Sequence, residues 1–180
     1  SGNQDGSNWY NALPWSFAPT RGNTYYLAGG QYSTATKTFE IAADGTKLIT
    51  IKKATAENSG SVTGWQESYA AQAELGKIVI KSDYFVFDGV TGGGPYSWDE
   101  GFGIKARATT TNSMVVSILN ASHVQLKHIN IEGLDRTTPI DIRGLLIQYT
   151  SHVLVSHCRI HHTYKSSGGV GDSDNVVIEY

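Results

Sequence analysis

The chain has few cysteines, few charged residues and no long apolar run, three features that often indicate the class of a protein. It contains one cysteine, Cys158, so no internal disulfide can form, and its position in an apolar run predicts a buried small hydrophobic residue. Charged residues make up only 17 % of the chain, with 14 basic against 16 acidic. This balance predicts no nucleic-acid partner and no attraction to a membrane surface. No apolar run reaches the roughly 18 residues of a membrane-spanning helix, so no membrane span is expected.

What the chain does contain is a short pattern that occurs four times. Each copy begins with a polar turn pair, continues with alternating apolar residues and ends in a polar corner. The copies lie at residues 82–90, 122–129, 151–158 and 174–180. Aligned on Phe85, Val124, Val153 and Val176, they are separated by 39, 29 and 23 residues. A short strand that returns at intervals of about 20 to 40 residues is typical of a solenoid.

The alternation within the copies indicates the kind of solenoid. Pairs such as Phe85/Phe87 and Val124/Leu126 place every second side chain on one face, as in a half-buried strand. The runs are too short for helices, and clusters of Gly, Ser, Asn and Asp bound them. Unequal steps fit coils with a constant core and loops of different length, whereas a left-handed hexapeptide helix needs a stricter period. The sequence therefore predicts an all-β fold, a right-handed parallel β-helix.

Two segments are expected to have separate roles, a lead-in over 1–20 and the β-helix coils over 21–180. The lead-in carries the aromatic residues Trp9, Tyr10, Trp15 and Phe17, which we expect to cap the first coil, because terminal repeats need a different cover. Strands are predicted within 21–32, 38–42 and 47–53. Good helix formers at 65–75, followed by Gly76, predict a short helix or a folded loop.

The sequence stops inside the fourth copy of the repeat. A coil that ends in this way leaves unpaired strand edges, which are templates for pairing with another chain. Two expectations follow. Further coils or a partner chain complete the β-helix, or the open coil docks on another copy and gives end-to-end self-association.

Residues 21–32 read RGNTYYLAGGQY and residues 45–55 read GTKLITIKKAT. These runs resemble the opening coils of secreted right-handed β-helix proteins of the pectate-lyase-like superfamily, and the later copies resemble their S-x-x-V-x-I repeats. The resemblance covers most of 21–180. It implies a secreted, extracellular protein that binds an acidic polysaccharide or cleaves it by β-elimination. This fold also occurs in proteins with other activities and in proteins with no catalytic activity. The alternative is therefore a non-catalytic extracellular solenoid, either a surface adhesin or a filament-forming subunit.

A lyase of this type must neutralise a uronate carboxylate and remove the proton next to it. In the turn at 132–143, Arg136 and Arg143 could supply positive charge, and Asp135 and Asp141 could hold Ca²⁺. Solvated surface ion pairs are the ordinary alternative for these residues. The Asp-Asp, Gly-His and Arg-x-Lys set that the resemblance implies for a glycoside hydrolase is absent, which argues against a polygalacturonase.

A second group of candidates follows His157. His161, His162 and Lys165 are the best candidates for an acid or a base in this chain. Three histidines near Cys158 also suggest zinc, but the spacing matches no established zinc pattern. We expect the earlier histidines to stack between coils, pairing His123 with His152 and His128 with His157.

The remaining candidates are aromatic and acidic. Flat aromatic rings on loops suit sugar stacking, or they pack their own loops against the solenoid; these residues are Trp65, Tyr96, Trp98 and Tyr164. Asp172 and Asp174 lie in a Gly-rich turn whose oxygen atoms could bind Ca²⁺, although Asp also begins strands for ordinary turn reasons.

Overall fold

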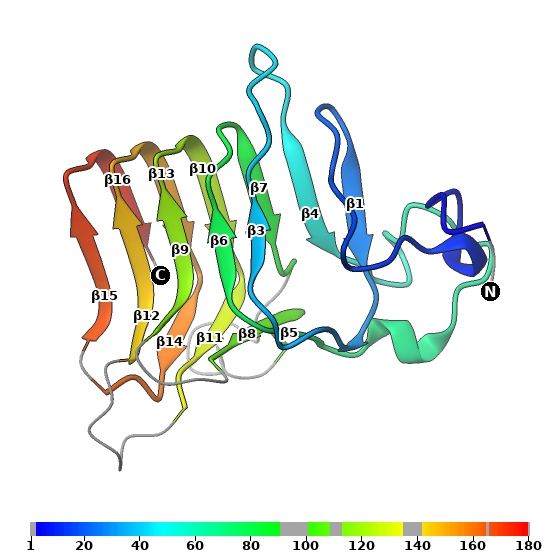
Figure 1. Ribbon diagram of the computed structural model, residues 1–180. Coiled ribbons are helices and arrows are strands. Elements are labelled where there is room, and N and C mark those ends of the chain that lie inside the picture. Colours follow the sequence, from blue (N-terminus) through cyan, green and yellow to red (C-terminus); the bar gives the residue numbers. More distant parts are fainter. Residues whose placement is uncertain (1–2, 91–100, 109–112, 135–141, 165, 180) are drawn as a thin grey trace.

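The computed structural model describes residues 3–90, 101–108, 113–134, 142–164 and 166–179 (Figure 1). Over these residues the protein is all-β, with three parallel sheets and two short 3-10 helices, η1 (Trp9–Asn11) and η2 (Glu67–Ala70). The chain visits the sheets in turn, so strands three apart in sequence are neighbours. This is the arrangement of a solenoid like a parallel β-helix, and it confirms the predicted all-β class.

Each sheet collects one strand from every coil. Sheet A contains β1 (Thr24–Leu27), β4 (Ile49–Lys53), β7 (Phe85–Asp88), β10 (Ser122–Lys127), β13 (Ser151–Ser156) and β16 (Asp174–Glu179). Sheet B contains β2 (Gly30–Gln31), β5 (Ala73–Leu75), β8 (Ile104–Arg107), β11 (Ile129–Glu132) and β14 (Arg159–His161). Sheet C contains β3 (Lys37–Phe39), β6 (Ile78–Ile80), β9 (Ser113–Leu119), β12 (Ile142–Gln148) and β15 (Ser166–Gly171).

The register of sheet A confirms the alignment of the four sequence copies. Val124 pairs with Phe85 on one side and with Val153 on the other, and Val153 pairs with Val176. Parallel pairing stacks these side chains at the spacing of neighbouring strands, about 4.8 Å. The inward rows of the three sheets meet in one apolar core, in which Phe39 lies 5.0 Å from Phe85 between ring centroids.

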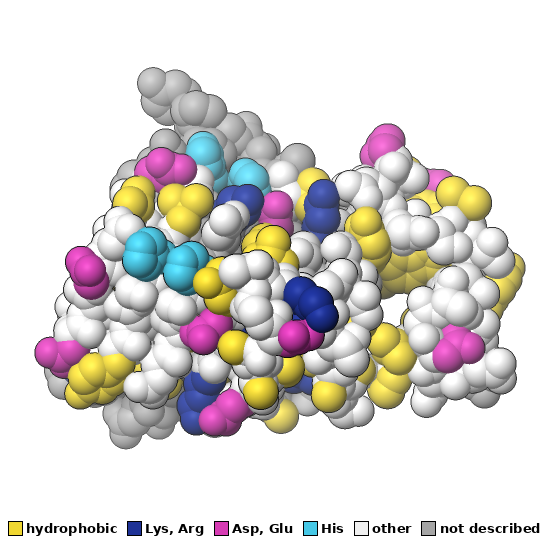
Figure 2. All heavy atoms as spheres, turned by 90° about the horizontal axis from the view of Figure 1, so that it is seen from above, with side chains coloured by type: hydrophobic (Ala, Val, Ile, Leu, Met, Phe, Trp, Pro, Cys, Tyr) yellow, Lys and Arg dark blue, Asp and Glu magenta, His cyan; other side chains and the backbone are white. Residues whose placement is uncertain are grey.

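The corners between strands are formed by residues with positive φ. After sheet C the chain turns into sheet A at Tyr84, His123, His152 and Asn175, whose φ angles lie between 50° and 56°. Asn and His tolerate this left-handed conformation better than most residues. The rings of His123 and His152 stack with centroids 4.6 Å apart, so the predicted stacking of these histidines is confirmed. Figure 2, which views these turns from above, shows histidine side chains lying side by side on the surface.

The second predicted pair, His128 and His157, is also stacked, at 5.4 Å between centroids. Cys158 follows this corner and is buried, as expected, with its Sγ donating to the carbonyl of Leu126. Burial raises the pKa of the Cys158 thiol to about 12, so a neutral thiol faces the core. Among the described residues no helix is long and apolar enough to cross a membrane.

The segment at 65–75 differs from the prediction over its second half. A single 3-10 turn forms at Glu67–Ala70, but Ala73–Leu75 is strand β5, with Ala73 and Leu75 buried. The helix propensity of these residues is a weak local preference. Pairing with β2 and β8 and the burial of two apolar side chains outweigh it.

Residues 3–20 lie along the first coil. Trp15 packs against Tyr32 and Phe39, with ring centroids 5.1 Å and 6.2 Å away, and Phe17 packs against Tyr25 at 4.8 Å. A cavity of about 770 Å³ lies between the lead-in and β1, so the lead-in does not fill this space. Its role as a cap stays a prediction.

Candidate functional site

The outer face of sheet B carries a group of interacting polar side chains in the described part of the chain. Alternation in β8, β11 and β14 buries Ile104, Ile129 and Ile131 and turns the residues between them outward. Pairing then forms two outward rows. One contains Glu74, Lys105, Asn130 and Arg159, and the other contains Arg107, Glu132 and His161.

Glu132 is at the centre of this group. Its Oε2 atom lies 2.7 Å from Lys105 Nζ and 3.4 Å from Arg107 Nε, and its Oε1 atom lies 3.3 Å from His162 Nδ1. Burial alone would raise the pKa of Glu132, but the hydrogen bond and charge of Lys105, with the charge of Arg107, lower it below the ordinary value. The carboxyl group is therefore ionised at neutral pH.

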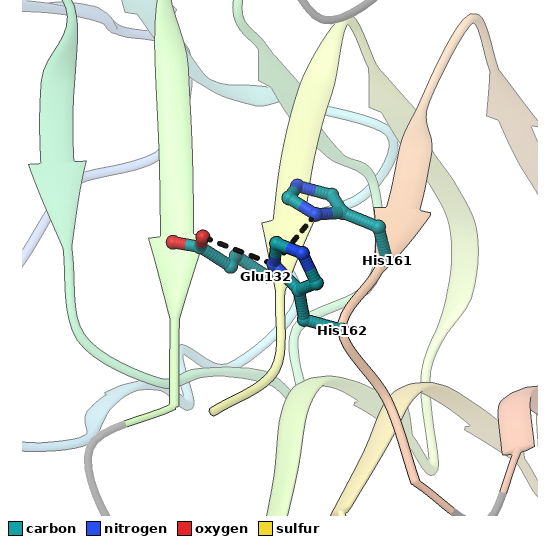
Figure 3. Close-up of side chains that lie close together, drawn as sticks. All are labelled: Glu132, His161 and His162. Carbon is teal, nitrogen blue, oxygen red and sulfur yellow. Dashed lines mark hydrogen bonds and ion pairs between the residues drawn. The ribbon is translucent and has the colours of Figure 1, made fainter. Parts of the chain in front are cut away.

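Two adjacent histidines complete the group (Figure 3). His161 ends β14, and its Nε2 lies 2.7 Å from Asn130 Oδ1, while its Nδ1 lies 3.0 Å from Nδ1 of His162. His162 has a φ of 55°, and this turn directs its ring back toward Glu132. Burial, with the nearby positive charge of Arg159, lowers the pKa of His161 to about 4. His161 is therefore a neutral imidazole at neutral pH.

The structure brings together two of the residues that the sequence singled out, His161 and His162. Arg143 lies at the start of β12 in sheet C and is half-buried. Tyr164 is 47 % exposed and follows β14. The other candidates in these loops lie outside the described residues, namely Tyr96, Trp98, Asp135, Arg136, Asp141 and Lys165.

Trp65 is in a different environment from the histidines. Its ring lies 5.4 Å from Trp9 and 5.8 Å from Tyr69, in an aromatic cluster that joins the lead-in to the segment before β5. These contacts agree with the expected alternative of loop packing, and sugar stacking by Trp65 stays a prediction. The exposed Asp172 lies at a corner with a φ of 48°, and Asp174 begins β16.

Over the described ranges, the three residues positioned to share a metal ion are Glu132, His161 and His162. Asp172 and Asp174 do not belong to this group, and Ca²⁺ at these two residues stays a prediction. The sequence reasoning did not single out Glu132, Lys105 or Arg107. A signal was available, because the 29-residue step that aligns Val124 with Val153 also aligns Glu132 with His161.

No protein-family model, curated protein or solved structure matches this chain.

Proposed function

We propose that this chain is an extracellular right-handed parallel β-helix of the pectate-lyase-like kind that binds an acidic polysaccharide on the outer face of sheet B. The observation that carries the proposal is the cationic group around the two histidines. Lys105 and Arg107 lie on β8 and Arg159 lies on β14, the two strands that flank β11, and Glu132 of β11 lies between Lys105 and His162.

The charge of this face favours an anionic ligand of extended shape. Over the described outward rows the basic side chains Lys105, Arg107 and Arg159 face the carboxylates Glu74 and Glu132, an excess of one positive charge before the imidazoles are counted. The Arg107 side chain is 51 % exposed. Guanidinium groups bind carboxylates through two parallel hydrogen bonds, which suits the repeated carboxylates of a uronate polymer.

β-Elimination would require a base beside the bound uronate. An imidazole can accept a proton, and His161 and His162 are the two imidazoles among the described residues of this face. In this proposal they are the groups that contact the reacting sugar, and the basic side chains neutralise its carboxylate.

The experiment compares Arg107→Ala with wild type for binding to polygalacturonate and to alginate, with neutral dextran as the ligand control. We expect Arg107→Ala to weaken binding about 5- to 20-fold, because one charge-assisted contact to the ligand is lost. Binding should also fall with added salt. Lys47→Ala, at an exposed turn, is the matched charge control and should bind as wild type does.

Lyase activity is measured separately, by the ultraviolet absorbance of the unsaturated uronate product. Equal binding of acidic and neutral polymers, or no binding to either, would refute the proposal. Binding without product formation would support the polysaccharide-binding site and refute β-elimination.

A second candidate is the non-catalytic solenoid, a surface adhesin or filament-forming subunit. The observation that favours it is the presence of exposed apolar side chains on two strands, Val170 on β15 and Val177 and Ile178 on β16, each between 47 % and 51 % exposed. These side chains are available to a further coil or a second chain. Light scattering over a range of concentrations tests it, because end-to-end assembly without polysaccharide binding would favour this candidate.

A further inference from the structure

The three side chains at the centre of the site present their free ligand atoms to one another. His161 Nδ1 lies 3.0 Å from His162 Nδ1, and His162 Nδ1 lies 3.3 Å from Glu132 Oε1. One ligand atom from each of the three residues lies within 4.8 Å of those of the other two. Two ligands bound at about 2.05 Å to a tetrahedral zinc ion are themselves about 3.3 Å apart. The two separations that His162 Nδ1 makes, 3.0 Å and 3.3 Å, are therefore close to those of ligand atoms that share a metal ion.

The hydrogen bonds around the two histidines do not provide enough donors for the Nδ1 atoms of His161 and His162, which face each other. Asn130 Oδ1 is an acceptor, so His161 donates from Nε2 and presents the bare lone pair of Nδ1. His162 Nδ1 then faces two acceptors, the imidazole lone pair and Glu132 Oε1, and has one proton at most. A cation in place of that proton would satisfy all three atoms.

Neighbouring groups hold each ligand in the orientation that a metal site needs. Asn130, only 7 % exposed, fixes the ring of His161 through the nitrogen remote from the site. Lys105 and Arg107 occupy Oε2 of Glu132 and leave Oε1 directed at the histidines. Ligating histidines and carboxylates in proteins usually have such supporting partners.

The surrounding charges select among metals. Lys105, Arg107 and Arg159 oppose any cation, so general electrostatic attraction cannot hold an ion here, and the imidazole bonds must do so. Nitrogen ligands favour zinc and its first-row neighbours, whereas Ca²⁺ prefers oxygen ligands. Three protein ligands also leave one position of a tetrahedral zinc ion open, as in sites that bind a water molecule or an exogenous group.

We propose that Glu132, His161 and His162 form a binding site for a divalent transition-metal ion of the zinc class. The site shares His161 and His162 with the proposed β-elimination, and an imidazole nitrogen that binds a metal ion cannot also accept a proton. Metal binding itself needs no saccharide, and it uses neither Cys158 nor His157. Its ligands come from two consecutive coils, so the stacked fold is needed to assemble it.

The test measures Zn²⁺ binding by titration calorimetry, on chelator-treated protein with any histidine tag removed and no saccharide present. We expect one equivalent of Zn²⁺ to bind and Ca²⁺ not to compete. His162→Asn and Glu132→Gln should each weaken Zn²⁺ binding by on the order of 100-fold, because each removes one of three ligands, and Asn130→Ala about 10- to 100-fold through loss of support. With Co²⁺ as the probe, the visible spectrum should show nitrogen and oxygen ligands without thiolate.

The matched control is His123→Asn. His123 is an exposed histidine with a φ of 56°, close to the 55° of His162, but it lies at a corner of sheet A. It should bind Zn²⁺ as wild type does. Circular dichroism establishes that each variant is folded. The side chain of His162 is 52 % exposed and that of Glu132 is 13 % exposed, so His162→Asn is the less disruptive of the two ligand changes. Absence of saturable Zn²⁺ binding in wild type, or equal loss in His123→Asn and His162→Asn, would overturn the proposal. Neither result would change the prediction for Arg107 and polysaccharide.

Discussion

At the scale of single residues, Lys53 is the most unusual side chain of the described core. It ends β4, is 2 % exposed, and donates to the carbonyls of Ala54 at 2.6 Å and Tyr69 at 2.7 Å. Burial lowers the pKa of Lys53 from 10.5 to about 8. Because a neutral amine still has two N–H donors, both hydrogen bonds can persist after the proton is lost.

The free energy of unfolding should therefore depend on pH through Lys53. Between about pH 8 and 10.5 the unfolded chain binds more protons at this residue than the folded chain, so stability rises with pH across that window. We expect the stability of wild type relative to Lys53→Met to increase by about 1 to 2 kcal/mol from pH 7 to pH 9.5. Urea denaturation at several pH values measures this difference. Lys47→Met is the control and should keep the wild-type pH dependence, whereas parallel curves for wild type and Lys53→Met would contradict the prediction.

At the scale of strands and turns, the left-handed corners fix where each coil bends. His152 has a φ of 53°, a conformation that is costly for a β-branched residue and tolerable for Asn. His152→Val should therefore lower the free energy of unfolding by about 1 to 2 kcal/mol more than His152→Asn, since both lose the stack on His123 and only Val adds strain. Denaturant titration measures both variants. Gln125→Val, at an outward position of β10, is the control and should change stability little. Equal stability of the Val and Asn variants would show that this corner is not strained.

The same turns explain what could be predicted from the sequence. Sheet A repeats a corner and an alternating run in constant register, so its strands could be aligned from Phe85 to Val176 without a structure. Strand β5 could not be predicted, because its three residues pair with strands contributed by other coils. The site was found only in part. His161 was visible as a candidate, but its contact with Glu132 depends on coil stacking that local motifs do not encode.

At the scale of the whole molecule, Lys37 is one of the residues that attach the lead-in to the coils. Its Nζ donates to the carbonyls of Trp15 at 2.8 Å and Phe17 at 2.6 Å, and lies 5.3 Å from the centroid of the Trp15 ring. Burial lowers the pKa of Lys37. In a solenoid each unit contacts only its neighbours, so loss of this attachment should stay local.

Lys37→Met should therefore loosen residues 3–20 and leave the three sheets intact. Two charge-assisted hydrogen bonds are removed, and we expect amide hydrogen exchange in this segment to accelerate by on the order of 10- to 100-fold. Exchange within β10 and β13 should remain at the wild-type rate, and far-ultraviolet circular dichroism should be unchanged. Hydrogen exchange with mass spectrometry of peptides resolves the two regions, with Lys47→Met as the control for loss of a surface lysine. Faster exchange across all three sheets would show instead that the lead-in and the coils unfold as one cooperative unit. Unchanged exchange in residues 3–20 would show that the aromatic contacts of Trp15 and Phe17 are sufficient to hold the lead-in on the coils.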